Sequence, residues 1–363
     1  MPTVSSATIN PRNVTLPPSA NSSQSATLTL ASNSSQGATL TSTNISSGAT
    51  TPTTINIPHG STLPSTTKRS QLSPIFNTSQ GTHGIDSPTE KITFGGTGSD
   101  PGRFKDNRGV AVSADNEIFV TDKRNKRVQV FNINGDFLRL FPTSLLPKGD
   151  EEMLPSDISI DGEGHLWVVG RKESYFNAPV HVVQYNRIGL PLTTFEVPGP
   201  TWSIGVAITV DLHNDKILVI LLDEILMFQP NGSFCRSIGK GLHQYEYATS
   251  DNSGRILVTD YSHSKVQVYN HTGHWLFGFG GFGRGDGQLI RPSGVCTDSS
   301  GRVIVANDGN GRVDMFTSRG EFVRTVVEMD KSWGIAVGPD GHLVVTNVYD
   351  NTVTIFPATM IFP

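Results

Sequence analysis

The chain has only two cysteines in 363 residues, Cys235 and Cys296, and they lie far apart within apolar segments. Two distant cysteines exclude the disulfide framework of a small secreted domain. A structural zinc module needs clustered cysteine and histidine at short spacings, and no such cluster is present. We therefore expect neither a disulfide-stabilised fold nor a zinc-binding module in this sequence.

Long apolar runs are also absent. No stretch is long enough to span a bilayer, and the first residues, MPTVSSATINPRNVTL, contain no apolar segment typical of a signal peptide. We expect a protein without a membrane partner, located in the cytoplasm.

The sequence lacks the motifs of familiar catalytic sites. It contains no G-x-S-x-G, no HExxH and no phosphate-binding loop, and its ten histidines do not recur at one register through the chain. His165 and His342 do share a register, but we interpret both as turn residues. We predict no catalytic residue, no metal, no cofactor and no small-molecule substrate.

Charge and large apolar residues are scarce in residues 1–90. This segment holds 36 serines and threonines but only three Lys/Arg and two Asp/Glu. Such a composition buries too little apolar surface to offset the entropy of ordering. We predict a disordered Ser/Thr-rich tail over residues 1–90 and a folded domain over residues 91–363.

What the folded part contains is a repeat. GVAVSADNEIFVTD at 109–122 returns as YATSDNSGRILVTD at 247–260, GVCTDSSGRVIVAN at 294–307 and GIAVGPDGHLVVTN at 334–347. Looser copies begin at 157 and 205, so successive copies start 40 to 48 residues apart. A period of this length indicates an array of small sheets.

Each copy has the pattern of a four-stranded meander. A short apolar strand, an Asp/Asn/Gly turn and a β-branched strand precede an alternating strand such as RVQVF at 127–131. A glycine then recurs at one register, at 135, 189, 232, 273 and 320, where a hairpin requires a positive φ. Six such units predict an all-β fold, a six-bladed β-propeller.

The ends of the chain suggest how the ring closes. ITFGGTGSDPGRF at 92–104 matches FGFGGFGRGDGQL at 277–289, where the segment forms a fourth strand and the loop to the next blade. We expect the N-terminal strand at Ile92–Gly95 to complete the last blade and remove its exposed edge. The alternative gives that place to Thr359–Phe362.

The pattern FGG-x-G…G-x-F…GVAV…IFVTD…N-x-RVQVF…NGDF over residues 94–137 resembles the NHL repeat. That repeat builds the six-bladed propeller at the C-terminus of tripartite-motif (TRIM-NHL) proteins. The resemblance implies a recognition platform for RNA or protein, with ubiquitination depending on an upstream RING that this sequence lacks. Predicted blades two and three depart from the motif, with Gly170 and Leu222 where an Asp or Asn usually ends the second strand.

The candidate binding residues lie in loops that a meander brings to one face. The folded part carries 25 Lys/Arg and 30 Asp/Glu, so only a local cluster could attract a polyanion. We expect cations and possible base-stacking aromatics on this face: Arg103, Lys105, Arg108, Lys123, Arg124, Lys126, Tyr261, Arg284, Arg291, Trp333 and Tyr349. Arg127, Lys265 and Arg312 share one repeat position, which favours a structural role for them instead.

Three hypotheses for function remain open from the sequence. The first is a non-catalytic recognition module of TRIM-NHL type that binds protein, RNA or both, but not DNA. The second is a protein-only adaptor. The third, which fewer sequence features support, is a propeller enzyme that uses the central channel.

Overall fold

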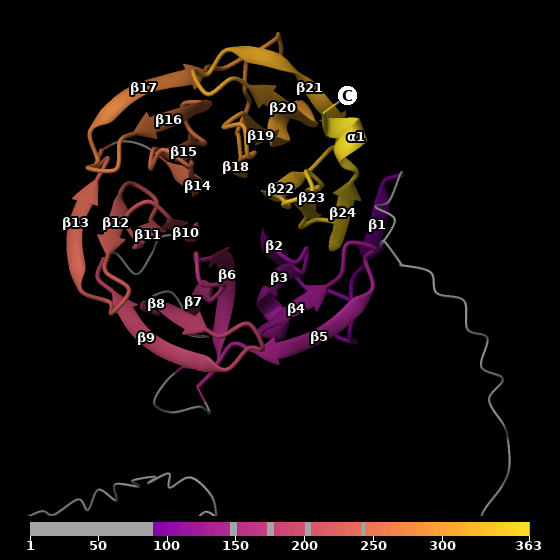
Figure 1. Ribbon diagram of the computed structural model, residues 1–363, viewed down its shortest axis with the longest axis vertical. Helices are drawn as coiled ribbons and strands as arrows, with labels where there is room; N and C mark the ends of the chain where they lie inside the picture. The colour runs from indigo at the N-terminus through magenta and orange to yellow at the C-terminus, as the bar shows by residue number, and fades with distance from the viewer. Residues whose placement is uncertain (1–89, 146–150, 173–177, 200–204, 242–243, 363) are drawn as a thin grey trace, which may run out of the picture. The chain divides into compact units, whose positions relative to one another are not determined.

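The computed structural model describes residues 90–145, 151–172, 178–199, 205–241 and 244–362. They form six four-stranded antiparallel sheets arranged as blades around a central axis (Figure 1). The predicted six-bladed β-propeller is therefore confirmed. The predicted tail, residues 1–90, lies outside the described residues except for Glu90, so the division of the chain at residue 90 stays a prediction.

Each blade runs outward from the axis, with its first strand innermost. Blade 1 comprises β2 (Asn107–Val112), β3 (Ile118–Asp122), β4 (Arg127–Phe131) and β5 (Phe137–Pro142). Blade 2 comprises β6 (Met153–Ile160), β7 (Leu166–Lys172), β8 (Val180–Tyr185) and β9 (Pro191–Val197). Blade 3 comprises β10 (Ala207–Asp211), β11 (Lys216–Ile220), β12 (Ile225–Phe228) and β13 (Phe234–Ile238).

The remaining blades repeat this order. Blade 4 comprises β14 (Tyr245–Ser250), β15 (Ile256–Asp260), β16 (Lys265–Tyr269) and β17 (Trp275–Gly280). Blade 5 comprises β18 (Val295–Thr297), β19 (Val303–Asn307), β20 (Arg312–Phe316) and β21 (Phe322–Glu328). Blade 6 comprises β22 (Ser332–Val337), β23 (Leu343–Asn347), β24 (Thr352–Phe356) and β1 (Ile92–Gly95). Short 3-10 helices, η1 (Lys123–Asn125) and η2 (Asp308–Asn310), follow β3 and β19.

The ring closes through the N-terminal strand. β1 pairs antiparallel with β24, placing Ile92 opposite Ile355 and Phe94 opposite Val353 (Figure 1). The alternative closure by Thr359–Phe362 is wrong, because this segment contributes the helix α1 (Ala358–Ile361). The guanidinium of Arg324 in blade 5 holds α1 by donating to the carbonyls of Met360 (3.0 Å) and Ile361 (2.5 Å).

The recurring hairpin glycine has the backbone conformation that the sequence predicted. Its φ is 78° at Gly135, 91° at Gly189, 83° at Gly232, 87° at Gly273 and 83° at Gly320. At each position the N–H donates to the carbonyl three residues earlier, as Gly135 does to Asn132 over 3.0 Å. A side chain would be strained there, because L-residues rarely adopt a positive φ.

The apolar core lies between neighbouring blades. The second and third strands of every blade are almost wholly buried, and aromatic rings from adjacent blades meet, as Phe141 and Tyr185 do at 5.2 Å between centroids. Burial of these strands leaves two loop-bearing surfaces for recognition. The loop face carries the blade-to-blade loops and the turns between second and third strands. The turn face, opposite, carries the turns that follow the first and third strands.

Candidate functional site

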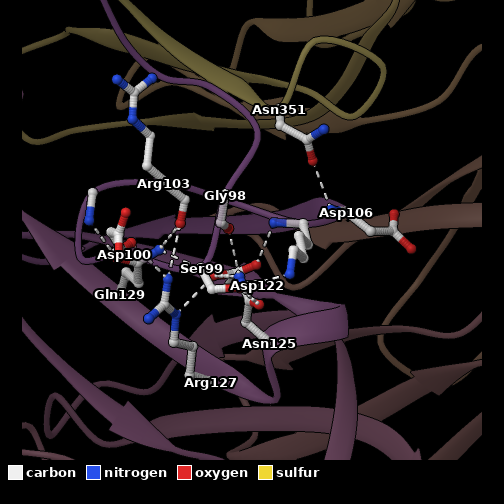
Figure 2. A network of polar contacts seen from close by, with 12 residues as sticks. Gly98, Ser99, Asp100, Arg103, Asp106, Asp122, Asn125, Arg127, Gln129 and Asn351 are labelled. Carbon is white, nitrogen blue, oxygen red and sulfur yellow. Dashed lines mark hydrogen bonds and ion pairs between the residues drawn. The ribbon is translucent and has the colours of Figure 1, made fainter.

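The side chain of Asp122, at the end of β3, organises the loop face beside blade 1 (Figure 2). It is fully buried and accepts hydrogen bonds from the backbone N–H of Lys105 (2.7 Å), Asn125 Nδ2 (2.8 Å) and Arg127 Nε (2.8 Å). A buried carboxylate with several donors is a stable arrangement, whereas an unpaired one is not. Asp122 therefore fixes the loop before blade 1 to the turn within blade 1.

Arg127 and Gln129 on β4 complete this attachment. Arg127 Nη2 donates to the carbonyls of Asp100 (3.0 Å) and Arg103 (2.9 Å), and Gln129 Nε2 donates to the same Arg103 carbonyl at 2.7 Å (Figure 2). Arg312 has the same kind of contact in blade 5, where its Nη2 donates to the carbonyl of Gly285 at 2.9 Å. The structural role predicted for this repeat position is therefore seen at Arg127 and Arg312.

Arg103 and Lys105 are exposed on this loop but are held by nearby acceptors. Arg103 Nη1 donates to the carbonyl of Gly95 at 2.6 Å, and Lys105 Nζ donates to Ser99 Oγ at 2.6 Å. The Arg103 stem crosses so close to Gly98 that a Cβ there would lie 2.9 Å from Arg103 Cβ. Both cations thus extend over a loop whose backbone is already ordered.

Three of the predicted cations, Arg108, Lys123 and Arg124, interact with the carboxylate of Asp106. Asp106 accepts from Arg108 Nε at 2.7 Å and lies 3.9 Å from Arg124 Nε. The Arg108 guanidinium also lies 5.4 Å from the ring centroid of Trp333 on β22, within cation–π range. Arg108, Lys123, Arg124 and Trp333 are called the blade 1 cation group below.

Lys123 has other positive charges near it in this group. The pKa of Lys123 is lowered to about 8, first by burial and then by Arg108, with Arg124 and Arg171 acting in the same direction and Asp106 opposing them. A cation that is repelled by its neighbours marks a place where a negative ligand is favoured. Arg124, with 76% of its side chain exposed, is the member most accessible to such a ligand.

Carboxylates interrupt the positive surface. Lys126 turns toward blade 2, with its Nζ 3.4 Å from Glu152 Oε2. Glu246, on β14, has a pKa raised by burial, an effect that Arg108 opposes. Glu246 and Arg171 were missed by the sequence reasoning. Glu246 could have been found, because Arg108, Glu246 and Trp333 share one repeat position. Each lies two residues before the first-strand residue that pairs with the second strand, at Val120, Val258 and Val345 respectively.

The other predicted residues lie in the loop before blade 5 and in loop-face turns of blades 4 and 6. Arg284 and Arg291 are exposed in the loop before blade 5, and Tyr261 is half-buried after β15. Tyr349 is 62% exposed, and Lys331 Nζ lies 5.3 Å from its ring centroid. Among the described residues, no hydrogen bond or ion pair joins Arg284 or Arg291 to blade 1.

The channel contains a cavity of about 270 Å³ lined by the first strands of all six blades. Asp157 on β6 lines it, and its Oδ2 accepts from the backbone N–H of Ile208 at 2.9 Å. Burial raises the pKa of Asp157 to about 7. Within the described ranges, no group of three or more His, Cys, Asp or Glu side chains is placed to hold a metal ion. None of the helices that the structure describes has the length and apolar character needed to cross a membrane.

Comparisons with known proteins agree with this architecture. Residues 108–131 match the model of the NHL repeat. The E3 ubiquitin-protein ligase TRIM32 of Mus musculus is 24% identical over 311 residues, which cover 77% of this chain and 46% of that protein. The protein brain tumor of Drosophila melanogaster is 30% identical over 155 residues, covering 41% of this chain and 14% of that protein. The matched region thus spans less than half of these relatives.

Solved structures share the fold at low identity. A protein of unknown function from Bacteroides thetaiotaomicron superposes with a TM-score of 0.56 at 12% identity, over 74% of this chain and 76% of that one. A streptogramin B lyase superposes with a TM-score of 0.51 at 14% identity, over 74% of this chain and 98% of that one. At such identity these likenesses concern the fold alone. The repeat match, the curated relatives and the ring of six sheets show that the described residues form an NHL-repeat β-propeller resembling those of the TRIM-NHL family.

Proposed function

We propose that this chain is a non-catalytic recognition module of the cytoplasm that binds single-stranded RNA through the loop face. The observation that carries the proposal is the blade 1 cation group, in which Arg108 lies over the indole of Trp333 and Lys123 and Arg124 interact with the same Asp106 carboxylate. Proteins bind single strands by combining cations for the phosphates with aromatic rings for the bases. The resemblance to TRIM-NHL propellers, which implies a recognition platform for RNA or protein, also supports this proposal.

The order of the surrounding loop also supports the proposal. Asp122, Arg127 and Gln129 fix the backbone that carries Arg103 and Lys105. A loop ordered before binding loses little conformational entropy when a ligand arrives. Arg103 and Lys105 are therefore suited to contact further phosphates along the same strand.

The test is the binding of fluorescent single-stranded RNA across a salt series. Lys123→Glu with Arg124→Glu should weaken binding at least ~tenfold and reduce the slope of log Kd against log salt by about 2, because each lost phosphate contact removes about 1. The control is Arg236→Glu with Arg319→Glu, which makes the same charge change at exposed arginines on β13 and on the turn face. Wild-type protein that shows no salt-dependent RNA binding would overturn the proposal.

A protein-only adaptor is the second candidate, favoured by the carboxylates within the same surface. Glu152 pairs with Lys126, and Asp106 pairs with Arg108. Interleaved charges of both signs suit a protein partner of mixed charge better than a polyanion. A partner protein whose capture from lysate resists nuclease and is lost with Lys126→Glu would support this candidate.

The role in ubiquitination is a proposal about a longer protein. The TRIM32 relatives carry the name E3 ubiquitin-protein ligase, and this chain matches less than half of their length. We propose that the propeller would select the partner when it is joined to a RING. The expected outcome is ubiquitin transfer to the bound partner protein by a RING fusion, but not by a fusion that carries Lys126→Glu.

A further inference from the structure

A pocket of about 200 Å³ opens on the turn face between blades 2 and 3. Trp167 and Ile217, both buried, form its floor, while Asp161, Glu163 and Asp215 lie at its edge. This volume is smaller than the pockets that enclose a drug-sized ligand. The pocket therefore suits a single side chain.

The other blades show which group suits this location. In blade 4, Arg255 Nε donates to Asp251 Oδ2 at 2.7 Å, and Arg255 Nη1 reaches the carbonyl of Ser318 in blade 5 at 2.8 Å. In blade 5, Arg302 Nε donates to Asp298 Oδ2 at 2.7 Å. In both blades a guanidinium thus donates to the aspartate of the first turn, and the guanidinium of Arg255 also contacts the next blade.

Blade 2 has the aspartate but lacks the arginine. Asp161 occupies the position of Asp251 in the first turn. In both turns the aspartate carbonyl accepts from the N–H of the glycine three residues later, and the aspartate N–H donates to the carbonyl of the residue four positions later. That fourth residue is His165, which is shorter than arginine. Pro230 lines the pocket and occupies the position that Ser318 has in blade 5. The two positions correspond because each follows the residue, Gln229 or Thr317, whose carbonyl accepts from the N–H of the hairpin glycine. The pocket is therefore the space that an arginine would fill.

The charge of the pocket matches such a group. Among the residues that the structure describes, the hydrogen-bond partners of Asp161 Oδ2 are Trp167 Nε1 (2.9 Å) and His165 Nδ1 (3.2 Å), and Glu163 is 84% exposed. No lysine or arginine among the described residues forms an ion pair with Asp161, Glu163 or Asp215. Three carboxylates without a permanent cation attract a positive ligand.

We propose that this pocket binds the guanidinium of an arginine side chain from a partner protein. The guanidinium would donate to Asp161 and to the carbonyl of Pro230, as Arg255 does to Asp251 and Ser318. Glu163 or Asp215 would accept its remaining donors. A guanidinium fits better than an ammonium, because its planar fork donates to two carboxylates at once.

The experiment follows the indole N–H signal of Trp167 in ¹⁵N-labelled protein, assigned with Trp167→Phe. N-acetyl-arginine amide should shift the signal saturably, and N-acetyl-citrulline amide, its neutral counterpart, should bind at least ~fivefold more weakly. Glu163→Gln with Asp215→Asn should weaken the arginine probe at least ~threefold. Glu321→Gln, an exposed acid in a blade 5 turn, is the control that should leave binding unchanged.

The decisive variant is His165→Arg, which supplies the missing arginine from within the chain. It should abolish binding of the probe and raise the melting temperature. Equal shifts with the arginine and citrulline probes, the lack of any saturable shift, or full binding by His165→Arg would each overturn the proposal. If His165→Arg does not fold, the Glu163→Gln, Asp215→Asn variant still decides the question: binding weakened at least ~threefold supports the proposal, and unchanged binding overturns it.

Discussion

The backbone N–H of Asp106 donates to Oδ1 of Asn351 over 2.7 Å, although the two residues are 245 positions apart in the chain (Figure 2). Asn351 also accepts from the N–H of Gly96 at 2.7 Å through its carbonyl, and its Nδ2 donates to Thr97 Oγ1 at 3.0 Å. One asparagine thus joins blade 6, the strand that closes it and blade 1.

Replacement of Asn351 should loosen the ring at this closure. Its φ is 55°, a conformation that asparagine and glycine tolerate better than other residues. We expect Asn351→Ala to lower the free energy of unfolding by about 2–4 kcal/mol, since it loses the side-chain hydrogen bonds to Asp106 and Thr97 and strains the backbone. Asn351→Gly keeps the conformation and should cost about half as much. Urea unfolding measures both, and equal losses would contradict the strain component.

Asp122, at the end of β3, should be the residue on which attachment of the loop before blade 1 depends most. Asp122→Ala leaves the largely buried guanidinium of Arg127 without its carboxylate, which should cost about 3–5 kcal/mol in the free energy of unfolding. Asp122→Asn keeps the shape and should cost less, because Asn307 and Asn347 occupy the same register in blades 5 and 6. Chemical denaturation tests this order, and a smaller loss for alanine than for asparagine would contradict it.

Asp157 should make the stability of the propeller depend on pH. Burial raises its pKa to about 7 in the folded protein, above its ordinary value of 3.8. Between these values the folded state binds more protons than the unfolded state, so this group contributes less stability as pH rises through the window. Asp157→Asn keeps an oxygen for the N–H of Ile208 and cannot ionise. As pH rises from 5 to 8.5, the free energy of unfolding of Asp157→Asn should increase by more than about 1 kcal/mol relative to that of wild type. Urea unfolding at both pH values measures this, and a difference between the two proteins that does not change with pH would contradict it.

Much of the fold could be predicted because each blade repeats the same local physics. The hairpin glycines at 135, 189, 232, 273 and 320 specify a positive φ, and the match of 92–104 with 277–289 indicated which strand closes the ring. Both signals are local patterns compared between copies. The segment at Thr359–Phe362 has no counterpart in the other described blades, and the hydrogen bonds that its helix accepts from Arg324 follow from no sequence pattern.

The candidate site was predicted less completely because loop position does not determine the direction of a side chain. The shared register of Arg127 and Arg312 indicated a structural role, and both guanidinium groups donate to backbone carbonyls of the loop before their blade. The pairing of Lys126 with Glu152 in blade 2 depends on how two blades approach each other. Glu246 adjoins Arg108 from the fourth blade, a proximity that only the closed ring creates.

Lys123 provides a test of the positive field on the loop face. Because its pKa is lowered to about 8, the side chain is charged at pH 7 and mostly neutral at pH 9. RNA binding should therefore weaken by roughly two- to fivefold between these values, about the effect of one phosphate contact. Lys123→Met should bind more weakly at pH 7 and lose this pH dependence.

Lys105→Met is the matched control, since it removes a different cation from the same loop face. It should weaken binding by a similar factor at both pH values and retain the fall between pH 7 and pH 9. Fluorescence anisotropy at constant ionic strength measures all three proteins. If Lys123→Met keeps the full pH dependence, a group other than Lys123 controls the response, and the proposed contact between Lys123 and phosphate would be wrong.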